Sequence, residues 1–320
     1  MQIGIIVPYG YRLLSAAAIL DVFETANHFY NNENETAPFS INIVCRDCEN
    51  SPFENYTSKN LEEDIQYDLL LIPSFKNEEL ENSLHQNLQW IPWLQTQYAQ
   101  GAALASFCTG AFLLAATGLL NNRPATTHIN AEGAFAKLFP LVQLQTDAVV
   151  TGQDRIYTSG GATNTFHLLM LLLEIYAGKQ VAIRAAKLFS IDLDRSRQTY
   201  FGTFSPAQDH GDTLVKQAQD EIKKNFSRLT TIEELIAQVP ASRRNLVRRF
   251  KQVTGITPIE YLQRTRIEAA KKLLEQSGCS ILEVMLESGY NDLKTFRALF
   301  KKTVGMTPTM YREKFSGQVV

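Results

Sequence analysis

FKQVTGITP at residues 250–258 returns fifty positions later as FKKTVGMTP at residues 300–308. A tyrosine stands at the same place after each copy, at Tyr261 and at Tyr311. Each copy lies at the end of a short amphipathic stretch, a turn and a second amphipathic stretch, which is the pattern of a helix-turn-helix motif. Self-similarity at a fixed period indicates a repeated structural unit. The sequence therefore predicts two helix-turn-helix units in the last third of the chain.

The first of these units combines an apolar face with a basic one. Ser242 is placed to cap the second helix, and Leu246, Phe250 and Val253 recur at spacings that bury one side of it. The remaining side chains are mostly basic, and such side chains suit the base edges and phosphates of a major groove. The candidate DNA-binding residues of this unit are Arg243, Arg244, Asn245, Arg248 and Arg249, with Lys251 beside them.

The second unit follows the same plan with different side chains. Phe296 and Phe300 are expected to point inward, and polar or basic residues are expected to point outward. Its candidate DNA-binding residues are Lys294, Thr295, Arg297 and Lys301, backed by Lys302. A generic helical domain with solvated charges is the alternative, but the same turn chemistry twice at a fixed spacing favours DNA binding.

The formal charge of the chain, −2, hides an uneven distribution. Residues 1–211 contain 12 Lys and Arg against 21 Asp and Glu, a net of −9, whereas residues 212–320 contain 19 against 12, a net of +7. A basic region beside an acidic one favours a nucleic-acid partner at the basic end, although net charge says nothing about sequence specificity.

Residues 213–315 resemble the AraC/XylS type of transcription activators. The spaced residues that carry the resemblance are Ser242, Leu246, Phe250, Gly255, Pro258, Tyr261, Leu262, Arg266, Ala269, Leu273, Leu274, Gly289, Tyr290, Asp292, Phe296, Phe300, Gly305, Pro308, Tyr311 and Arg312. The resemblance implies a central helix, here about residues 258–275, which holds both units so that their recognition helices meet one face of DNA about a helical turn apart.

Three positions depart from the pattern of that family. Ile236 and Met285 stand at or near places where the family usually keeps a small alanine, and Lys294 replaces a usual serine. We expect the first two to loosen helix packing and the third to shift base preference.

The first two hundred residues alternate short apolar runs with longer helical patterns, which is typical of a parallel α/β sheet with crossover helices. Strands are predicted at residues 3–7, 41–45, 69–72, 102–107 and 155–158, and helices at 14–29, 79–97, 111–119 and 164–176. Residues 200–212 lack periodicity and are predicted to be a linker. Helices are predicted beyond it at residues 213–226, 232–239, 243–254, 258–275, 281–288, 293–304 and 307–315. The expected architecture is a flavodoxin-like α/β sensor domain at residues 1–199 and an all-α domain at residues 213–320 with two helix-turn-helix units.

Cys108 lies where a predicted strand turns sharply into a predicted helix, in the stretch LASFCTGAF at residues 104–112. Backbone N–H groups at such a turn favour an anion or a thiolate. Together with ATTH at residues 125–128, YDLLLIP at 67–73 and TSGG at 158–161, this stretch resembles the ThiJ/PfpI branch of the class I glutamine amidotransferase-like fold. More narrowly, the whole chain resembles GlxA-type regulators, which join that fold to an AraC-type tail.

The sequence argues against catalysis at Cys108. Proteases of the PfpI type have a histidine directly after the cysteine, where this chain has Thr109. Residues 73–75 lack the paired glycines that help to present oxyanion donors, and residues 13–15 offer no carboxylate. We expect no enzyme activity, with a cysteine-dependent hydrolase or amidase as the alternative. A buried structural thiol is the alternative interpretation of Cys108.

A ligand pocket at the carboxyl ends of the strands is the preferred interpretation, since open α/β sheets bind ligands there. Its candidate residues are Ser15, Ser74, Cys108, Thr109 and His128. The expected partners are a small-molecule effector, double-stranded promoter DNA and a second copy of the chain. An architectural protein that binds DNA without sequence preference is a further alternative.

The four cysteines, Cys45, Cys48, Cys108 and Cys279, are too few and too scattered for a disulfide framework, so we expect reduced thiols. Cys45 and Cys48 have metal-ligand spacing but lack a second pair or a histidine cluster, so neither metal nor cofactor is expected. The amino terminus runs straight into an apolar strand without a signal-peptide pattern, and no apolar stretch is long enough to span a membrane. A soluble cytoplasmic protein is expected.

Overall fold

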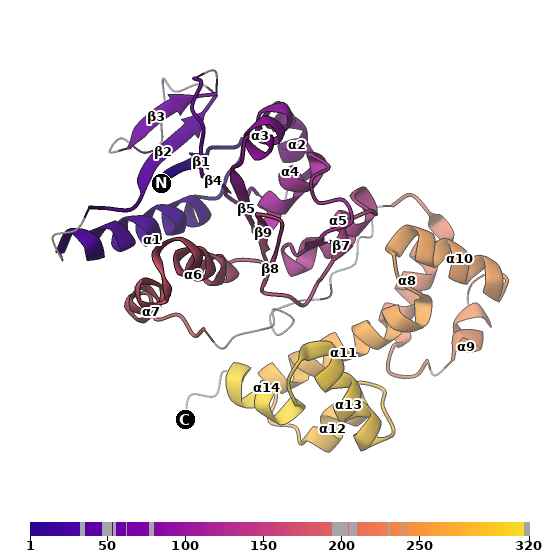
Figure 1. The fold of residues 1–320 in the computed structure, drawn as a ribbon. Coiled ribbons are helices and arrows are strands. Elements are labelled where there is room, and N and C mark those ends of the chain that lie inside the picture. The colour runs from indigo at the N-terminus through magenta and orange to yellow at the C-terminus, as the bar shows by residue number, and fades with distance from the viewer. Residues whose placement is uncertain are drawn as a thin grey trace. The chain divides into compact units, whose positions relative to one another are not determined.

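The computed structural model divides the chain into two compact units, residues 1–198 and 199–320 (Figure 1). It describes residues 1–32, 36–46, 53, 56–61, 63–76, 80–193, 204, 210–229, 231–237, 239 and 241–316. Most of the expected linker, residues 200–212, lies outside this part of the chain. We call the two parts the N-terminal unit and the C-terminal unit and consider each by itself.

A seven-stranded sheet forms the middle of the N-terminal unit, with strand order β3-β2-β1-β4-β5-β9-β8. All neighbouring strands are parallel except β8 and β9, which form an antiparallel hairpin. The strands are β1 (Gln2–Ile6), β2 (Ser40–Cys45), β3 (Thr57–Asn60), β4 (Leu69–Ile72), β5 (Ala103–Phe107), β8 (Val150–Gln153) and β9 (Ile156–Ser159). The central strands read as continuous apolar runs because helices cover both faces of the sheet, and β4 is buried at every position.

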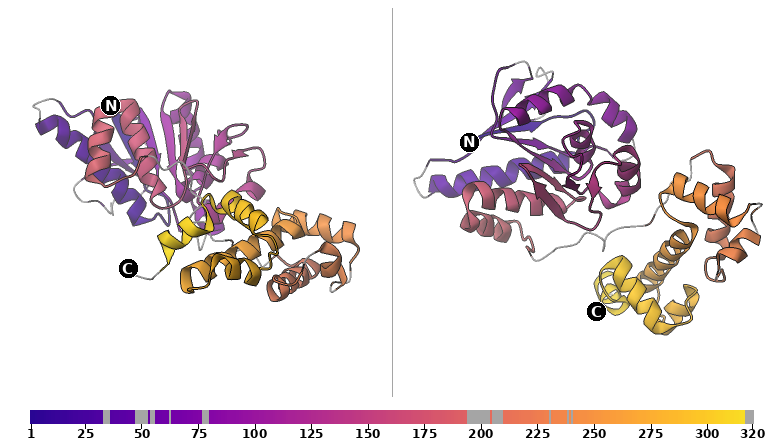
Figure 2. Two further views of the ribbon diagram at one scale, coloured as in Figure 1. Left: turned by 90° about the horizontal axis from the view of Figure 1, so that it is seen from below. Right: turned by 45° about the vertical axis from the view of Figure 1, so that its right-hand side comes forward.

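Two layers of helices enclose this sheet (Figures 1 and 2). One face packs against α1 (Leu13–Asn32), α6 (Asn164–Ala177) and α7 (Lys179–Leu188). The other packs against α2 (Leu80–Gln86), α3 (Trp90–Ala99), α4 (Ala111–Ala116) and α5 (Glu132–Leu138). Two single-turn helices, η2 (Cys108–Gly110) and η3 (Ile129–Ala131), and a small second sheet of β6 (Pro124–Ala125) and β7 (Gln143–Leu144) complete the unit.

One predicted helix is wrong in its extent. The pattern at residues 79–97 indicates a single helix, whereas the structure has α2 and α3 with a break at Asn87. The Asn87 amide donates to the backbone oxygens of Ser83 (2.6 Å) and Tyr9 (3.1 Å) and accepts from the Tyr9 N–H (2.7 Å). It thereby binds the loop after β1, a contact that helical periodicity cannot indicate. The sequence patterns also gave no indication of β3, β6, β7, β8, α5 or α7.

Seven helices make up the part of the C-terminal unit that the structure describes. They are α8 (Thr213–Asn225), α9 (Ile232–Ala237), α10 (Arg243–Thr254), α11 (Pro258–Gln276), α12 (Ile281–Glu287), α13 (Leu293–Val304) and α14 (Pro308–Phe315) among the described residues. The parallel α/β fold followed by a helical helix-turn-helix region is thus confirmed. One hydrophobic core joins α8, α9 and α10 to the first half of α11, and a second joins α12, α13 and α14 to its second half.

The repeated motif has a local structural explanation in helix caps. Gly255 and Gly305 end α10 and α13 in the left-handed conformation, with φ of +79° and +88°, which glycine adopts without strain. Thr257 and Thr307 then cap α11 and α14, each followed by a proline at the first helical position. The motif therefore encodes a helix end, a short turn and a new helix start, twice.

Met285 and Ile236 are the two residues that were expected to loosen helix packing. Met285 is 2% exposed within the second core, so it fills space there. The Ile236 side chain lies outside the described residues.

The cysteines differ from one another. Cys45 is disulfide-bonded, so the expectation of reduced thiols is wrong for this residue, and its partner lies outside the described residues. Cys108 and Cys279 are free. Within the described ranges, no three His, Cys, Asp or Glu side chains gather as metal ligands would. None of the helices in those ranges has both the length and the apolar character needed to cross a membrane.

Candidate functional site

Helix α10 presents a basic surface because its apolar face is anchored. Leu246 and Phe250 are fully buried, and the Ser242 hydroxyl caps the first turn by accepting from the Asn245 N–H (3.4 Å). Arg244 and Arg248 are consequently exposed on the outward side. The Asn245 side chain accepts from the Arg248 guanidinium (3.4 Å), which holds that guanidinium beside the start of the helix.

Arg243 forms an ion pair with Glu233 of α9 at 2.8 Å. The two side chains are 69% and 61% exposed, and ion pairs of this kind contribute little stability. Arg243 can therefore exchange Glu233 for another anion. The sequence patterns did not single out Glu233, because the spacing of two residues on different helices carries no signal.

Arg249 has a partner that the sequence patterns did not indicate. It donates to both carboxylate oxygens of Asp212, at 2.9 Å and 2.8 Å. Asp212 is also the N-cap of α8, accepting from the Val215 N–H (3.1 Å). Burial opposes ionisation of Asp212, but the hydrogen bonds from Arg249 and Val215 outweigh it and lower its pKa. Arg249 thus ties α10 to α8, and we leave it out of the candidate DNA-binding surface.

Helix α13 repeats the arrangement of α10. Phe296 and Phe300 are fully buried, and Asp292 caps the helix by accepting from the Thr295 N–H (2.6 Å). Hydrogen bonds from the Thr295 hydroxyl and N–H lower the pKa of Asp292, which keeps the cap charged. The exposed side chains of this helix include the four candidates Lys294, Thr295, Arg297 and Lys301, together with Lys302.

In the N-terminal unit, Cys108 is the first residue of η2 and directly follows β5, and its backbone at this turn is strained. Its φ is +55°, a value that residues other than glycine rarely adopt. Thr127 holds the turn by donating to the Cys108 carbonyl (3.0 Å). A Cβ on Gly110 would lie 2.6 Å from the Ile72 oxygen and 2.7 Å from the Pro73 oxygen, so only glycine fits where η2 meets the end of β4.

The Cys108 thiol is held in its protonated form. Burial raises its pKa, and this effect outweighs the N–H groups of Ala162 and Thr109, the Thr109 hydroxyl and the charge of Arg12, which all act in the other direction. The thiolate is the nucleophilic form of cysteine. Cys108 is therefore a weak nucleophile near neutral pH.

Two of the candidate ligand residues have their hydroxyl groups occupied. Thr109 accepts from the Phe75 N–H (3.0 Å) and donates to the Phe75 carbonyl (2.7 Å). Ser15 accepts from the Ser74 N–H (3.1 Å). These hydroxyls fix the start of α1 and η2 against the loop after β4, and so they build the site. Ser74 itself is 3% exposed.

His128 packs against the end of β9. A Cβ on Gly161 would collide with its imidazole ring, and its Nδ1 accepts from the Asn130 N–H (3.1 Å). Burial and then the charge of Arg12 lower the pKa of His128, so it is neutral at pH 7. Arg12 thus lowers the pKa of both Cys108 and His128 through its charge. The sequence patterns did not single out Arg12. The available signal is that Arg12 is the only Lys or Arg among residues 1–45.

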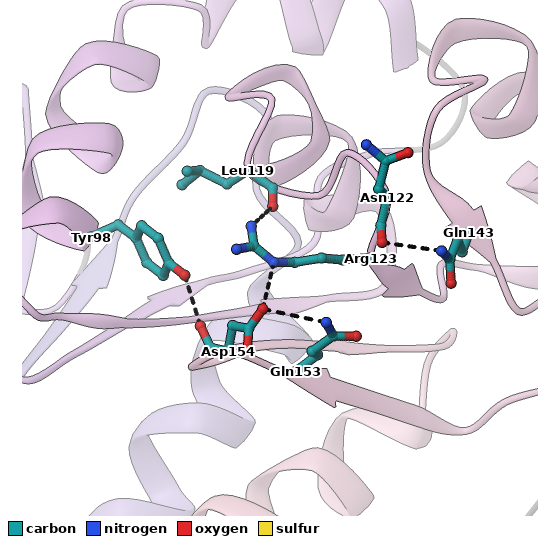
Figure 3. A network of polar contacts seen from close by, with 7 residues as sticks. All are labelled: Tyr98, Leu119, Asn122, Arg123, Gln143, Gln153 and Asp154. Carbon is teal, nitrogen blue, oxygen red and sulfur yellow. Dashed lines mark hydrogen bonds and ion pairs between the residues drawn. The ribbon is translucent and has the colours of Figure 1, made fainter.

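A second polar network lies at the opposite end of β9 (Figure 3). Arg123 pairs with Asp154 at 3.0 Å and donates to the Leu119 carbonyl, and the Tyr98 hydroxyl donates to the Asp154 carbonyl (2.8 Å). Asp154 is in the turn between β8 and β9, whereas Phe107, the residue before Cys108, pairs with Ser159 at the other end of β9. The network therefore supports the sheet away from the Cys108 turn.

Two family models match the chain, one for each unit. A helix-turn-helix domain model matches residues 235–314, and the DJ-1/PfpI family model matches residues 39–175. Both stretches contain candidate site residues described above.

Similar proteins include regulators from Pseudomonas aeruginosa. The HTH-type transcriptional regulator GbdR of strain UCBPP-PA14 is 26% identical over 236 residues, which are 71% of this chain and 61% of GbdR. The HTH-type transcriptional regulator CdhR is 28% identical over 224 residues, 69% of this chain and 66% of CdhR. The chain thus matches less than two thirds of the length of each relative.

A protein from Vibrio parahaemolyticus described as a transcriptional regulator has a similar solved structure. It has a TM-score of 0.51 and 20% identity, and the match covers 59% of this chain and 98% of that one. At this identity the likeness bears on the fold alone.

Proposed function

This chain joins a DJ-1/PfpI domain to an AraC-type helix-turn-helix region, and from that combination we propose that it is a sequence-specific, DNA-binding regulator of transcription. The relatives named above are transcriptional regulators. The protein is expected to act in the cytoplasm, where bacterial promoter DNA lies.

The observation that carries this proposal is the structural equivalence of α10 and α13. Each has 12 residues, begins at a side-chain cap, ends at a left-handed glycine and buries two large apolar side chains. Each leaves polar and basic side chains exposed at its amino-terminal end, where recognition helices contact base edges. The net charge of +7 in residues 212–320 supports the same partner.

The length of α11 suits two contacts with one duplex. Its 19 residues span about 28 Å at 1.5 Å per residue, and one turn of B-form DNA is about 34 Å. Because α10 and α13 belong to the cores at the two halves of α11, we expect them to enter successive major grooves on one face of the DNA.

The N-terminal unit is proposed to bind a small metabolite at the carboxyl ends of β1, β4, β5 and β9. Open α/β sheets bind ligands at this edge, beside the point where the strand order reverses. Ser74, Cys108 and His128 come from the loops there, and Arg12 supplies a positive charge. Binding of the metabolite would change the population of the states that are competent to bind DNA. A homodimer of the chain would double the number of DNA contacts.

Hydrolysis through Cys108 is the second candidate function, and the strained backbone of that residue favours it. The protonated thiol argues against it. A Cys108→Ala variant separates the two candidate functions. If the chain is a regulator, the variant keeps DNA binding. If it is a hydrolase, the unmodified chain turns over thioester or amide substrates and the variant does not.

The decisive test of the proposed function is selection from random DNA. The full-length chain is mixed with duplexes that carry a random core of about 30 base pairs, close to three helical turns. We expect enrichment of a defined motif at moderate salt. Equal recovery of all sequences would reject specific recognition, and recovery of none would reject DNA binding.

A further inference from the structure

Arg266 is a buried cation at the boundary between the two cores of the C-terminal unit. On α11, the preceding core residue Leu262 belongs to the first core and the following residue Ile267 belongs to the second. Arg266 is only 9% exposed. A guanidinium is costly to bury, and it is retained inside a protein only where it makes good hydrogen bonds.

The hydrogen bonds of Arg266 go to the first helix-turn-helix half. Its Nε donates to the Phe226 carbonyl (2.8 Å) and its Nη2 to the Leu229 carbonyl (2.6 Å). Both carbonyls belong to the loop that links α8 to α9. Two donors from one planar group fix the orientation of that loop relative to α11 as well as its distance.

The other side of the same guanidinium contacts the second half. Its central carbon lies 5.2 Å from the centre of the Tyr290 ring, and Tyr290 stands in the turn between α12 and α13. Tyr290 also packs on Phe296, a core residue of α13, with ring centres 5.4 Å apart. Arg266 is therefore linked through Tyr290 to the buried face of α13.

The two halves also touch backbone to backbone at this point. A Cβ on Gly289 would lie 2.7 Å from the Ser227 Cα, 2.8 Å from the Ser227 oxygen and 2.9 Å from the Arg266 Nε. Gly289 has a φ of +84°. Only glycine permits this approach, so the turn of the second unit sits directly against the loop of the first.

We propose that Arg266 is a positioning residue that sets the distance and angle between α10 and α13, and thereby the spacing between the two DNA segments that the chain recognises. This inference rests on the proposed DNA-binding function. Figure 2 shows α11 running between the two groups of helices. The contacts of Arg266 and Gly289 described above form a second link between these groups, which we call the joint. Without the joint, the two recognition helices would keep their own base contacts but lose a fixed separation.

The test compares the spacing preferences of full-length variants by selection from the random duplexes described above. Arg266→Met keeps the length and the apolar stem but removes both donors, and replacing a buried charge by an apolar side chain is often tolerated. Lys271→Met is the matched control, because Lys271 is another buried cation on α11 but pairs with Glu268 (2.9 Å) of the same helix. The measurement is the distribution of base-pair distances between the two enriched blocks.

We expect a single spacing for the unmodified chain and for Lys271→Met, and a spread over neighbouring spacings for Arg266→Met, with the bases within each block unchanged. If Arg266→Met loses its helical circular dichroism, Arg266→Lys and Tyr290→Leu are used for the test instead. Arg266→Lys weakens the joint but keeps a charge in place, and Tyr290→Leu weakens it but keeps an apolar side chain in place.

Three results are distinguishable. A folded Arg266 variant that enriches the same single spacing, with weaker binding overall, overturns the positioning role and leaves a structural one. Enrichment of only one block by the unmodified chain also overturns it, but leaves DNA binding intact. No enrichment by the unmodified chain rejects the proposed function and this inference together.

Discussion

At the scale of single residues, two adjacent arginines on α10 have different surroundings. Arg248 is exposed and contacts only the Asn245 side chain of its own helix among the interactions described above, whereas Arg249 forms two hydrogen bonds with Asp212. The pair with Asp212 uses two edges of the Arg249 guanidinium and holds it against α8, whereas no such pair restrains the Arg248 guanidinium among the interactions described above. Neighbours in sequence therefore have different expected roles.

We predict that Arg248→Ala loses roughly 1–3 kcal/mol of specific binding, the usual value of a bidentate arginine contact to a base. The preference should relax at one position of the selected motif, as measured by competition with single-base variants of it. Arg249→Ala is the matched control and should lower stability without altering base preference. Uniform weakening of Arg248→Ala on all sequences would assign that residue to phosphate.

Cys108 is predicted to react slowly with iodoacetamide at pH 7. Its pKa lies above the ordinary value because the thiol is buried, so its thiolate fraction at pH 7 is below that of an ordinary cysteine and grows as the pH is raised. Peptide mass spectrometry of the labelled chain gives the rate, with the half-buried Cys279 as the internal comparison. If Cys108 were labelled faster than Cys279 at pH 7, the protonated, buried state of the Cys108 thiol would be contradicted. In urea, both cysteines should react equally.

At the scale of elements, Gly110 controls how η2 meets β4. We predict that Gly110→Ala destabilises the N-terminal unit, because the two carbonyl oxygens that a Cβ would strike are backbone atoms that cannot swing away. Gly133→Ala in α5 is the control: a Cβ there meets nothing within 4 Å, and alanine favours a helix over glycine by up to about 1 kcal/mol. Urea unfolding followed by tryptophan fluorescence measures both, since Trp90 and Trp93 lie in α3. Equal midpoints for the two variants would refute this account of the turn.

The cap of α12 predicts a pH dependence of the C-terminal unit. Hydrogen bonds from the Ser280 N–H and hydroxyl lower the pKa of Glu283 below its ordinary value of 4.5. The stabilisation that the ionised Glu283 carboxylate gives the folded C-terminal unit is therefore complete above pH 4.5, and it is lost as the pH falls through the lowered pKa. Glu283→Gln should reduce this acid dependence, as measured by thermal unfolding followed by circular dichroism between pH 3 and pH 6, about the range in which carboxyl groups titrate. An unchanged acid dependence would show that other carboxylates dominate.

At the scale of the whole molecule, the two units have separate hydrophobic cores, so we predict separate unfolding transitions. Both tryptophans are in the N-terminal unit, and fluorescence therefore reports on that unit alone. Gly110→Ala should shift the fluorescence midpoint while the purified chain keeps its DNA motif, and Glu283→Gln should leave the fluorescence midpoint unchanged. A single coincident transition that both variants shift would instead indicate that the units unfold together.

The sequence by itself determined the features that depend on neighbours along the chain. The bounds of α10 and α13 follow from caps and left-handed glycines within a few residues of each helix end. The central strands follow from runs that are apolar on both faces. Such signals are local, because they involve φ values, capping groups and periodicity that a short stretch already contains.

Only the tertiary structure decided which polar side chains are already occupied. Arg249 and Asp212 are 37 residues apart, the Ser15 hydroxyl and the Ser74 N–H are 59 apart, and Asn87 and Tyr9 are 78 apart. Arg12 likewise approaches Cys108 and His128 only when the loops after different strands meet. A hydrogen bond between distant segments has no periodicity in sequence, since its partners are brought together by the packing of the elements that carry them.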